Sequence, residues 1–348
     1  MYDYLIVGCG LSGATCARLL AEKGNRVLIV EKRNHIGGNV YDEYDETGIL
    51  VHRYGPHIFH TRDKEVWDFL SQFTPWHPYQ HRVLAYICGK YVPLPINLDT
   101  INLLYGTNYD ANNIDDFFQR VRQNDLEIKN ARDIVIAKVG TDLYEMFFKG
   151  YTIKQWGLDP EELAPEVTAR IPVRYNRDDR YFEDPYQGIP KLGYTVMVAK
   201  MIDHPKIHFL LNCDYKEVVN EIEYGAMINT GPIDYHFDYK FGPLPYRSLR
   251  FEYEFHATEY YQKAGTVNYP NDYDFTRITE FKHFTGQIVR GTTVVKEYPT
   301  AEGDPYYPIP RRSNRELYQL YAGEAQKSQN LFFTGRLGSY KYANMDIV

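Results

Sequence analysis

The chain has 348 residues, which is enough for two or three domains and a large core. Hydrophobic residues make up 44% and charged residues 24%, the ordinary balance of a globular protein. The net charge of −7 argues against nucleic acid or an anionic membrane as a general partner. No apolar run approaches the roughly 18 residues of a membrane-spanning helix, and the first residues lack the pattern of a signal peptide.

The N-terminus carries a dinucleotide fingerprint. An apolar strand, Leu5–Val7, is followed by glycines in G-x-G-x-x-G spacing. Gly8 is expected to make a tight turn and Gly10 to let the backbone approach a pyrophosphate. Gly13 is expected to let helix and strand pack closely. The pyrophosphate would sit on the N-terminus of the following helix, where free N–H groups favour anions.

A second strand supports this interpretation. Val27–Val30 is apolar and ends on Glu31, which is placed to accept hydrogen bonds from ribose hydroxyls. Gly37 and Gly38 follow soon after, and a second close backbone approach suits a longer cofactor such as FAD; an ordinary turn is the alternative. The helix between the strands is expected to bury Leu11, Cys16, Leu19 and Leu20.

Regular elements follow in chain order. A helix over 63–73 is expected with Thr61 or Asp63 as N-cap, and then a hairpin over 83–92. Asp99 is expected to cap a helix that opens a mostly helical stretch. Residues 236–310 alternate apolar and polar side chains, which predicts an antiparallel sheet. Further elements are expected as a helix over 193–201, strands near 207–211, 227–231 and 331–334, and a helix over 316–326.

These elements predict an α/β protein with a Rossmann-like FAD-binding domain, a helical insertion and an antiparallel β-sheet domain. We assign 1–75, 190–235 and 325–348 to the FAD-binding domain. The helical domain spans 98–165 and includes a lid leading into 166–180. The antiparallel sheet domain comprises 76–97, 181–189 and 236–324.

Aromatic and basic residues stand out in the middle of the chain. Residues 143–157 predict a surface loop that carries an exposed Trp156 and acts as a lid. Four arginines follow, and such a run is either a solvated face or a diphosphate site; they are Arg170, Arg174, Arg177 and Arg180.

Two other candidate sites are weak. His57 and His60 are three positions apart but have no carboxylate or cysteine at ligand spacing, so no metal is expected. The four cysteines show no zinc spacing, and the reduced state of a cytoplasmic protein is the simplest interpretation.

The motifs together resemble the UDP-galactopyranose mutase family along nearly the whole chain. They are Gly55-Pro-His-Ile-Phe-His-Thr61, Pro93-Leu-Pro-Ile-Asn97, Phe147-Phe-Lys-Gly-Tyr-Thr-Ile-Lys-Gln-Trp156, Thr276-Arg-Ile-Thr-Glu280, Tyr306-Tyr-Pro-Ile309 and Gly335-Arg-Leu-Gly338. The resemblance implies reversible ring contraction of UDP-galactopyranose to UDP-galactofuranose. It also implies that N5 of reduced FAD attacks the anomeric carbon while UDP leaves, a form of covalent catalysis.

The resemblance also implies roles for individual residues. Catalytic roles fall to Arg170, Arg277, Trp156 and His60, the two arginines holding the diphosphate. The expected substrate-binding residues are Phe147, Tyr151, Thr152, Trp156, Arg170, Tyr181, Arg277, Tyr307, Tyr342 and His81, the last replacing an Asn of some relatives. The expected cofactor-binding residues are Gly8, Gly10, Leu11, Ser12, Gly13, Glu31, Lys32, Gly38, Asn39, His57, His60, Arg336, Tyr342, Met345 and Asp346.

Two alternatives stay open on the residues alone. A flavin-dependent amine or sugar oxidase uses the same fingerprint, and a catalytically silent nucleotide-binding protein keeps it too. A cytoplasmic homodimer is expected from the resemblance, with UDP-galactose as partner and neither nucleic acid nor membrane. The family normally continues beyond Val348 into a closing helix that faces the flavin, so either that helix lies outside the given sequence or flavin binding is expected to be weaker.

Overall fold

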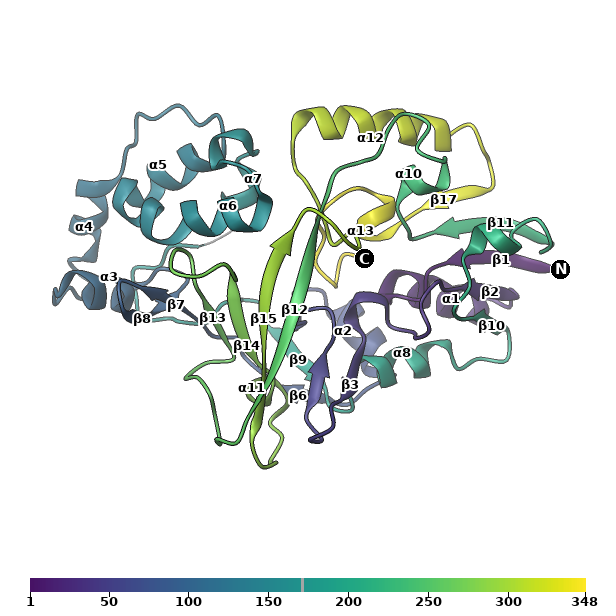
Figure 1. The fold of residues 1–348 in the computed structure, drawn as a ribbon, viewed down its shortest axis with the longest axis horizontal. Coiled ribbons are helices and arrows are strands. Elements are labelled where there is room, and N and C mark those ends of the chain that lie inside the picture. Colours follow the sequence, from purple (N-terminus) through teal and green to yellow (C-terminus); the bar gives the residue numbers. More distant parts are fainter. Residues whose placement is uncertain (170–171) are drawn as a thin grey trace.

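A parallel sheet of five strands, in the order β10-β2-β1-β11-β17, forms one end of the molecule (Figure 1). The computed structural model describes residues 1–169 and 172–348. Every pairing in this sheet is parallel, so the carboxyl ends of the strands lie along one edge. The strands are β1 (Tyr2–Val7), β2 (Val27–Val30), β10 (Ile207–Leu210), β11 (Tyr224–Asn229) and β17 (Leu331–Phe333).

Alternate side chains of this sheet enter two separate cores. Ile6 and Ile29 pack with α1 (Leu11–Glu22) and α8 (Tyr194–Ile202). Leu5 and Leu28 pack on the other face, with Tyr215 of the short helix α9 (Tyr215–Val218). Helices on both faces of a parallel sheet make the Rossmann-like arrangement that the sequence predicts.

The buried side of α1 differs from the prediction. Ala14, Ala17 and Ala21 are buried, whereas Leu19 is 43% exposed. Cys16 and Leu20 are only partly buried against the same core. Leu11 is buried as predicted, but beyond it the three alanines rather than Leu19 mark the inner face of the helix.

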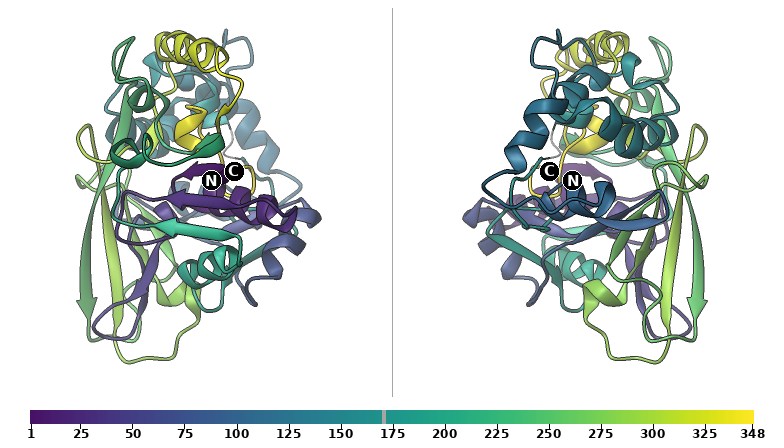
Figure 2. Two further views of the ribbon diagram at one scale, coloured as in Figure 1. Left: turned by 90° about the vertical axis from the view of Figure 1, so that its right-hand side faces the viewer. Right: turned by 90° about the vertical axis from the view of Figure 1, so that its left-hand side faces the viewer.

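A second sheet of seven strands forms one side of the molecule (Figure 2). Its order is β16-β12-β15-β14-β13-β7-β8, and all neighbours are antiparallel except β13 and β7. The alternating pattern of residues 236–310 therefore predicted β12 to β16 correctly, and the hairpin expected over 83–92 supplies β7 and β8. The strands are β7 (Val83–Ile87), β8 (Lys90–Leu94), β12 (Tyr246–His256), β13 (Thr266–Asn268), β14 (Arg277–Glu280), β15 (Thr292–Thr300) and β16 (Tyr307–Pro308).

A group of helices packs on its own core beside β7 and β8. Asn97 caps the first of them, accepting a hydrogen bond from the backbone of Thr100, 3.0 Å away. The prediction of Asp99 as the cap was wrong, since Asp99 lies inside the first turn. The group consists of α3 (Leu98–Tyr105), α4 (Ile114–Val121), α5 (Ala131–Leu143), a π-helix (Tyr144–Lys149), α6 (Gly150–Trp156), a 3₁₀ turn (Pro160–Glu162) and α7 (Glu166–Ala169).

Smaller elements complete the chain. Asp63 caps α2 (Lys64–Ser71), one of the two caps that the sequence allowed. Two small sheets are also present: the pair β3 (Asp42–Tyr44) and β4 (Leu50–His52), and the three strands β5 (Phe59–Thr61), β9 (Tyr186–Pro190) and β6 (Trp76–Pro78). The remaining helices are a 3₁₀ turn (Gly38–Val40), α10 (Ile233–His236), α11 (Lys282–Thr285), α12 (Arg312–Ala325) and α13 (Gly335–Gly338).

None of the helices within the described residues is long and apolar enough to cross a membrane.

Candidate functional site

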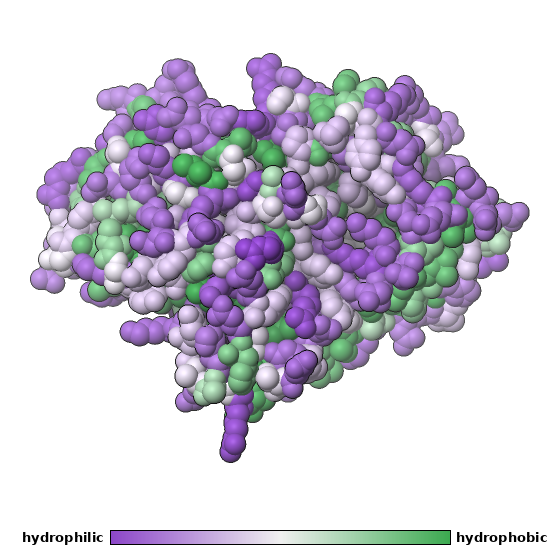
Figure 3. Space-filling view, viewed as in Figure 1, coloured by the Kyte–Doolittle hydropathy of each residue, from purple (hydrophilic) through white to green (hydrophobic). Residues whose placement is uncertain are grey.

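Two cavities adjoin at the centre of the molecule, and we call them the first and second clefts. The first has a volume of about 870 Å³ and the second about 400 Å³. His57, Arg336 and Met345 line both. The surface is hollowed between the parallel sheet and the region of α10 and α12, where the first cleft lies (Figure 3). Two ligands that must touch one another can therefore meet at these three residues.

The glycine fingerprint forms the floor of the first cleft. Gly8 has a φ of +98°, and a Cβ there would lie 2.2 Å from Oγ1 of Thr230. A Cβ on Gly13 would lie 2.0 Å from the carbonyl oxygen of Gly8, which explains the close packing of helix on strand. Gly13 is accordingly absent from the lining.

The second glycine pair meets the fingerprint directly. A Cβ on Gly38 would lie 2.8 Å from Cα of Gly10. Gly10 precedes the first turn of α1, and no side chain caps that turn. Free backbone N–H groups of a 12-residue helix thus face the cleft, the usual arrangement for binding a pyrophosphate.

Glu31 stands at the carboxyl end of β2 and is 5% exposed. Its Oε2 accepts a hydrogen bond from the backbone of Cys9, and its Oε1 accepts one from the backbone of Arg33, each at 2.8 Å. Each carboxylate oxygen can accept more than one hydrogen bond. Glu31 is therefore held rigidly and can still accept from a ribose.

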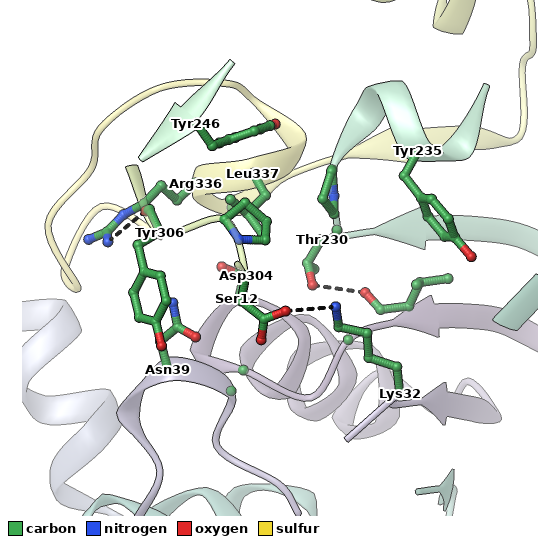
Figure 4. Close-up of a pocket in the computed structure, with 18 of the residues that line it drawn as sticks. Ser12, Lys32, Asn39, Thr230, Tyr235, Tyr246, Asp304, Tyr306, Arg336 and Leu337 are labelled. Atoms are coloured by element: carbon green, nitrogen blue, oxygen red, sulfur yellow. Dashed lines mark hydrogen bonds and ion pairs between the residues drawn. The ribbon is translucent and has the colours of Figure 1, made fainter. Parts of the chain in front are cut away.

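A short segment, residues 301–306, runs along the first cleft, and we call it the strap. Asp304 of the strap pairs with Lys32 at 3.7 Å (Figure 4). It also pairs with Arg33 at 3.0 Å. The carbonyl oxygen of Asp304 accepts a hydrogen bond from Oγ of Ser248 at 2.6 Å. The guanidinium of Arg33 also lies over the ring of Tyr54, 4.2 Å from its centroid. The strap thus connects the antiparallel sheet to the ribose end of the fingerprint.

These features fit a dinucleotide such as FAD. A Cβ would fill the glycine cradle, and the helix N-terminus is uncapped. Oδ1 of Asp234 lines the cleft region and is a buried acceptor with no hydrogen-bond partner among the described residues. Ten further predicted cofactor residues line the first cleft with Gly8: Gly10, Leu11, Ser12, Glu31, Lys32, Gly38, Asn39, His57, Arg336 and Met345.

A row of polar residues crosses the floor of the second cleft. Asn268, Arg277 and Glu297 are paired in register across β13, β14 and β15. Nε of Arg277 lies 3.4 Å from Oε2 of Glu297, although the geometry is not that of a hydrogen bond. Oδ1 of Asn268 and Oε1 of Glu297 are buried without partners among the described residues. Such unsatisfied groups are expected where a polar ligand binds.

The charges of this row are coupled. Burial would lower the pKa of Arg277, but Glu297 raises it above its ordinary value. Burial raises the pKa of Glu297, and Arg277 lowers it only in part. Arg277 is therefore a fixed cation at neutral pH, suited to a phosphate group.

Tyrosines form the wall beside Arg277. Burial raises the pKa of Tyr151 to about 12 and that of Tyr307 above its usual range. Their hydroxyls therefore stay protonated and can donate hydrogen bonds at neutral pH. Trp156 meets Tyr307 edge-on with ring centroids 6.3 Å apart, and Tyr342 stacks on Tyr307 at 6.0 Å.

The segment that carries Trp156 is helical, so the prediction of a surface loop was wrong. The π-helix and α6 cover residues 144–156 without a break, and Trp156 is half-buried rather than exposed. Nε of Arg247 donates to the carbonyl of Gln155 at 3.0 Å. Nζ of Lys154 donates to the carbonyl of Tyr273 at 2.7 Å. These bonds hold the end of α6 against β12 and against the loop between β13 and β14.

Three histidines line the second cleft, and two are held neutral. Burial lowers the pKa of His57 and of His81 to about 3. The backbone N–H of His57 donates to Nδ1 of the buried His52 at 3.1 Å. The third, His60, contacts a carboxylate, Asp184.

The structure brings most of the predicted substrate residues together. Arg170, which the sequence predicted to bind the diphosphate, lies outside the described residues, and Asp346 lines neither cleft. His60 and Tyr342 line the second cleft rather than the first. The second cleft is lined by Phe147, Tyr151, Thr152, Trp156, Tyr181, Arg277, Tyr307, Tyr342 and His81.

The other three arginines of the basic run take structural roles. Arg174 is buried and donates to the carbonyl of Asp178 at 3.1 Å. Arg180 pairs with the carboxylate of Asp178 at 2.7 Å, and Arg177 contacts Asp99. None of the three lines the second cleft.

Sequence reasoning missed several lining residues. Asn268 and Glu297 occupy ordinary positions in an alternating pattern, and only the register of three strands brings them to Arg277. Asp304 lies in a turn, where an acidic residue is common. Thr230 had a weak signal, because it precedes the Gly231-Pro232 end of a predicted strand.

Comparison with known proteins gives consistent relatives. A family model described as UDP-galactopyranose mutase matches residues 146–342, and a NAD(P)-binding Rossmann-like domain model matches residues 6–73. A probable UDP-galactopyranose mutase of Klebsiella pneumoniae is 41% identical over 99% of this chain and 91% of its own length. The dTDP-fucopyranose mutase of Escherichia coli is 40% identical over 100% and 95%. A solved structure of a reduced UDP-galactopyranose mutase shares the fold, with a TM-score of 0.79 at 18% identity over 99% of this chain and 92% of that chain.

Proposed function

Because the chain belongs to the UDP-galactopyranose mutase family, a family of isomerases, we propose that it interconverts UDP-galactopyranose and UDP-galactofuranose with reduced FAD. The observation that carries the proposal is the junction of the two clefts. A dinucleotide cradle opens at His57, Arg336 and Met345 onto a cleft with a fixed cation and a tyrosine wall. That geometry suits a flavin that must touch the sugar of a nucleotide sugar.

The chain's own residues would hold the cofactor in the first cleft. The glycines and the N-terminus of α1 suit the pyrophosphate, and Glu31 suits a ribose. When bound, reduced FAD supplies N5 as the nucleophile for the anomeric carbon.

The second cleft would retain the diphosphate while it is detached from the sugar. Arg277 offers a permanent charge, and the protonated hydroxyls of Tyr151 and Tyr307 offer hydrogen bonds. Charge-assisted hydrogen bonds contribute about 1.5–3 kcal/mol each. Stabilising the leaving group in this way lowers the barrier because its charge develops as the bond to the sugar breaks.

The histidines of the second cleft limit what acid–base chemistry the protein supplies. His57 and His81 stay neutral at physiological pH, since burial lowers the pKa of each to about 3. Neither can donate a proton as an imidazolium near pH 7. These two side chains therefore shape the cleft and exclude water from it, and they do not protonate the leaving group.

A second candidate activity is the same ring contraction on dTDP-fucopyranose. The relative from E. coli that carries this name is as similar to the chain as the K. pneumoniae protein. A flavin oxidase is not favoured, because the full-length relatives are mutases.

The proposal is tested with purified, flavin-loaded protein and dithionite. UDP-galactofuranose and dTDP-fucofuranose are supplied in separate reactions, and products are resolved by chromatography. We expect UDP-galactofuranose to become UDP-galactopyranose only with the reductant and without consumption of oxygen. Faster conversion of the dTDP sugar would establish the second candidate, and no conversion of either would refute both.

A cytoplasmic location and a homodimer belong to the same proposal. All four cysteines are free, which is consistent with a reducing compartment. Sedimentation equilibrium of the flavin-loaded protein tests the dimer, for which a mass near twice 40.8 kDa is expected.

A further inference from the structure

His60 has an acidic residue directly behind its ring. His60 lies in the middle of β5, and Asp184 lies just before β9, the strand that pairs with β5. Nδ1 of His60 is 2.5 Å from Oδ2 of Asp184. The contact joins two segments 124 positions apart in the chain, so it depends on the tertiary fold.

Asp184 is itself fixed and ionised. Its Oδ1 accepts a hydrogen bond from Nε of Arg62 at 2.8 Å. Burial raises the pKa of Asp184, but the hydrogen bonds from His60 and Arg62 outweigh it and leave the pKa below its ordinary value. An ionised carboxylate only accepts hydrogen bonds, so the proton in this contact belongs to Nδ1 of His60.

The ring of His60 cannot turn freely. It stacks on Phe182 with centroids 3.6 Å apart and planes 15° apart. The side chain is 11% exposed and lines the second cleft. Its other nitrogen, Nε2, has no hydrogen-bond partner among the residues that the structure describes.

We propose that Asp184, supported by Arg62, is a positioning residue that fixes the tautomer of His60 and presents the Nε2 lone pair to the second cleft as an acceptor for a hydroxyl of the sugar nucleotide. The inference rests on the proposed function only in that a sugar nucleotide occupies this cleft.

The chemistry of the surroundings favours a hydroxyl over the diphosphate. A neutral imidazole with Nδ1 protonated has only a lone pair at Nε2, and a lone pair repels phosphate oxygens. Asp184 adds negative charge behind the ring, whereas Arg277 provides the cation on the sheet floor. Both the ribose and the hexose carry hydroxyls, so either is a possible donor.

The tautomer is measured first, by ¹H–¹⁵N NMR of ¹⁵N-histidine-labelled, flavin-loaded protein at pH 8, above the ordinary imidazole pKa of about 6.5. His60→Phe assigns the signal and keeps the stacking on Phe182. We expect Nδ1 protonated and Nε2 bare in the wild type, and a mixture of tautomers in Asp184→Asn. A wild-type ring protonated on Nε2 would overturn the proposal, whatever reaction the protein catalyses.

Binding and turnover locate the hydroxyl. We expect Asp184→Asn to lower the affinity for UDP-galactose by roughly three- to tenfold, which corresponds to the loss of about one hydrogen bond. Unchanged affinity for UDP in the same variant identifies the hexose as donor, and an equal loss for UDP identifies the ribose. Asp68→Asn, which removes the same charge from an exposed ion pair on α2, is the matched control and should change neither affinity.

A double variant separates positioning from general structure. Because Asp184 acts through His60, we expect Asp184→Asn to have no further effect in the His60→Phe background. The same loss in both backgrounds would overturn the proposal, as would wild-type affinity of Asp184→Asn for both ligands. Circular dichroism confirms that each variant is folded before affinities are compared.

Discussion

Replacing Arg277 by Met tests two roles of this residue in the second cleft. Arg277 pairs with the buried Glu297, and we expect it to bind the diphosphate. The side chain of Glu297 is 2% exposed and that of Arg277 is 26% exposed. Arg277→Met leaves a buried carboxylate without its partner, a change that costs about 3–5 kcal/mol in fully buried pairs. Because water reaches the vacated side of this pair, we expect the lower end, a loss of about 3 kcal/mol in the free energy of unfolding.

The same variant also loses a charged contact to the diphosphate. At about 1.5–3 kcal/mol for such a bond, UDP affinity should fall roughly 10- to 150-fold. Adding Glu297→Gln removes the unpaired carboxylate and should restore most of the stability without restoring UDP affinity. Arg250→Met, an exposed arginine on β12, is the control and should alter neither property.

The pH dependence gives an independent check. Burial already holds the pKa of Glu297 above its ordinary value, and removing Arg277 raises it further. A raised folded-state pKa means that the destabilisation is full at high pH and disappears as the carboxyl is protonated on acidification. Urea titrations of Arg277→Met between pH 8 and 5 should therefore show stability recovering toward that of the double variant. Unchanged UDP affinity in folded Arg277→Met would refute the role of Arg277 as the phosphate cation.

Three further predictions concern the first cleft and the histidines. Asp304→Asn removes the ion pairs of the strap, so FAD should dissociate up to about fivefold faster in stopped-flow fluorescence. High salt should abolish this difference from the wild type. Equal dissociation rates at low salt would show that the strap does not retain the cofactor. In Gly38→Ala the backbone has a positive φ of 54° and the added Cβ would lie 2.8 Å from Cα of Gly10. Thermal unfolding should therefore show a loss of about 1–2 kcal/mol in the free energy of unfolding, and the protein should purify with less flavin. Full flavin content would argue against the glycine cradle. Burial lowers the pKa of His52, His57 and His81 to about 3. The free energy of unfolding should therefore be highest above about pH 6.5 and fall on acidification by up to about 1.4 kcal/mol per pH unit for each histidine. NMR titration of any of these rings near pH 6.5 would contradict their burial.

The sequence predicted those parts of the fold whose signals are local. The βαβ fingerprint, the alternating strands and the cap on α2 depend on residues near one another in the chain, and the structure confirms them. The position of Glu31 beside the fingerprint was predictable because its distance from the glycines follows from the length of one helix and one strand. Leu19 was misplaced because hydrophobicity alone does not distinguish a helix side covered by a sheet from one that faces solvent.

The second cleft was harder to predict because many segments far apart in the chain, from Tyr54 to Met345, build it. Residues 143–157 contain aromatic, polar and glycine residues that locally favour a loop. They form helix, and the end of α6 is held by Arg247 of β12 and by the carbonyl of Tyr273 in the loop between β13 and β14. The partnership of His60 with Asp184 spans 124 positions and leaves no periodic signal in the chain.

The resemblance to the mutase family identified site residues that lie far apart in the chain, which local patterns could not do. It identified Arg277, Tyr307 and Tyr181 as partners although 96 positions separate Tyr181 from Arg277 (277 − 181). All three line the second cleft. The resemblance did not identify Glu297, whose effect on the cleft acts through Arg277.

A crystal structure of the reduced, FAD-loaded protein with UDP-galactose tests the central claim most directly. The claim is that the first cleft binds the cofactor and the second binds the substrate, and that the two clefts meet at His57, Arg336 and Met345. We predict FAD in the glycine cradle, the diphosphate of the substrate on Arg277 and the hexose at the junction. A nucleotide sugar bound in the glycine cradle, or a hexose remote from the junction, would contradict the account.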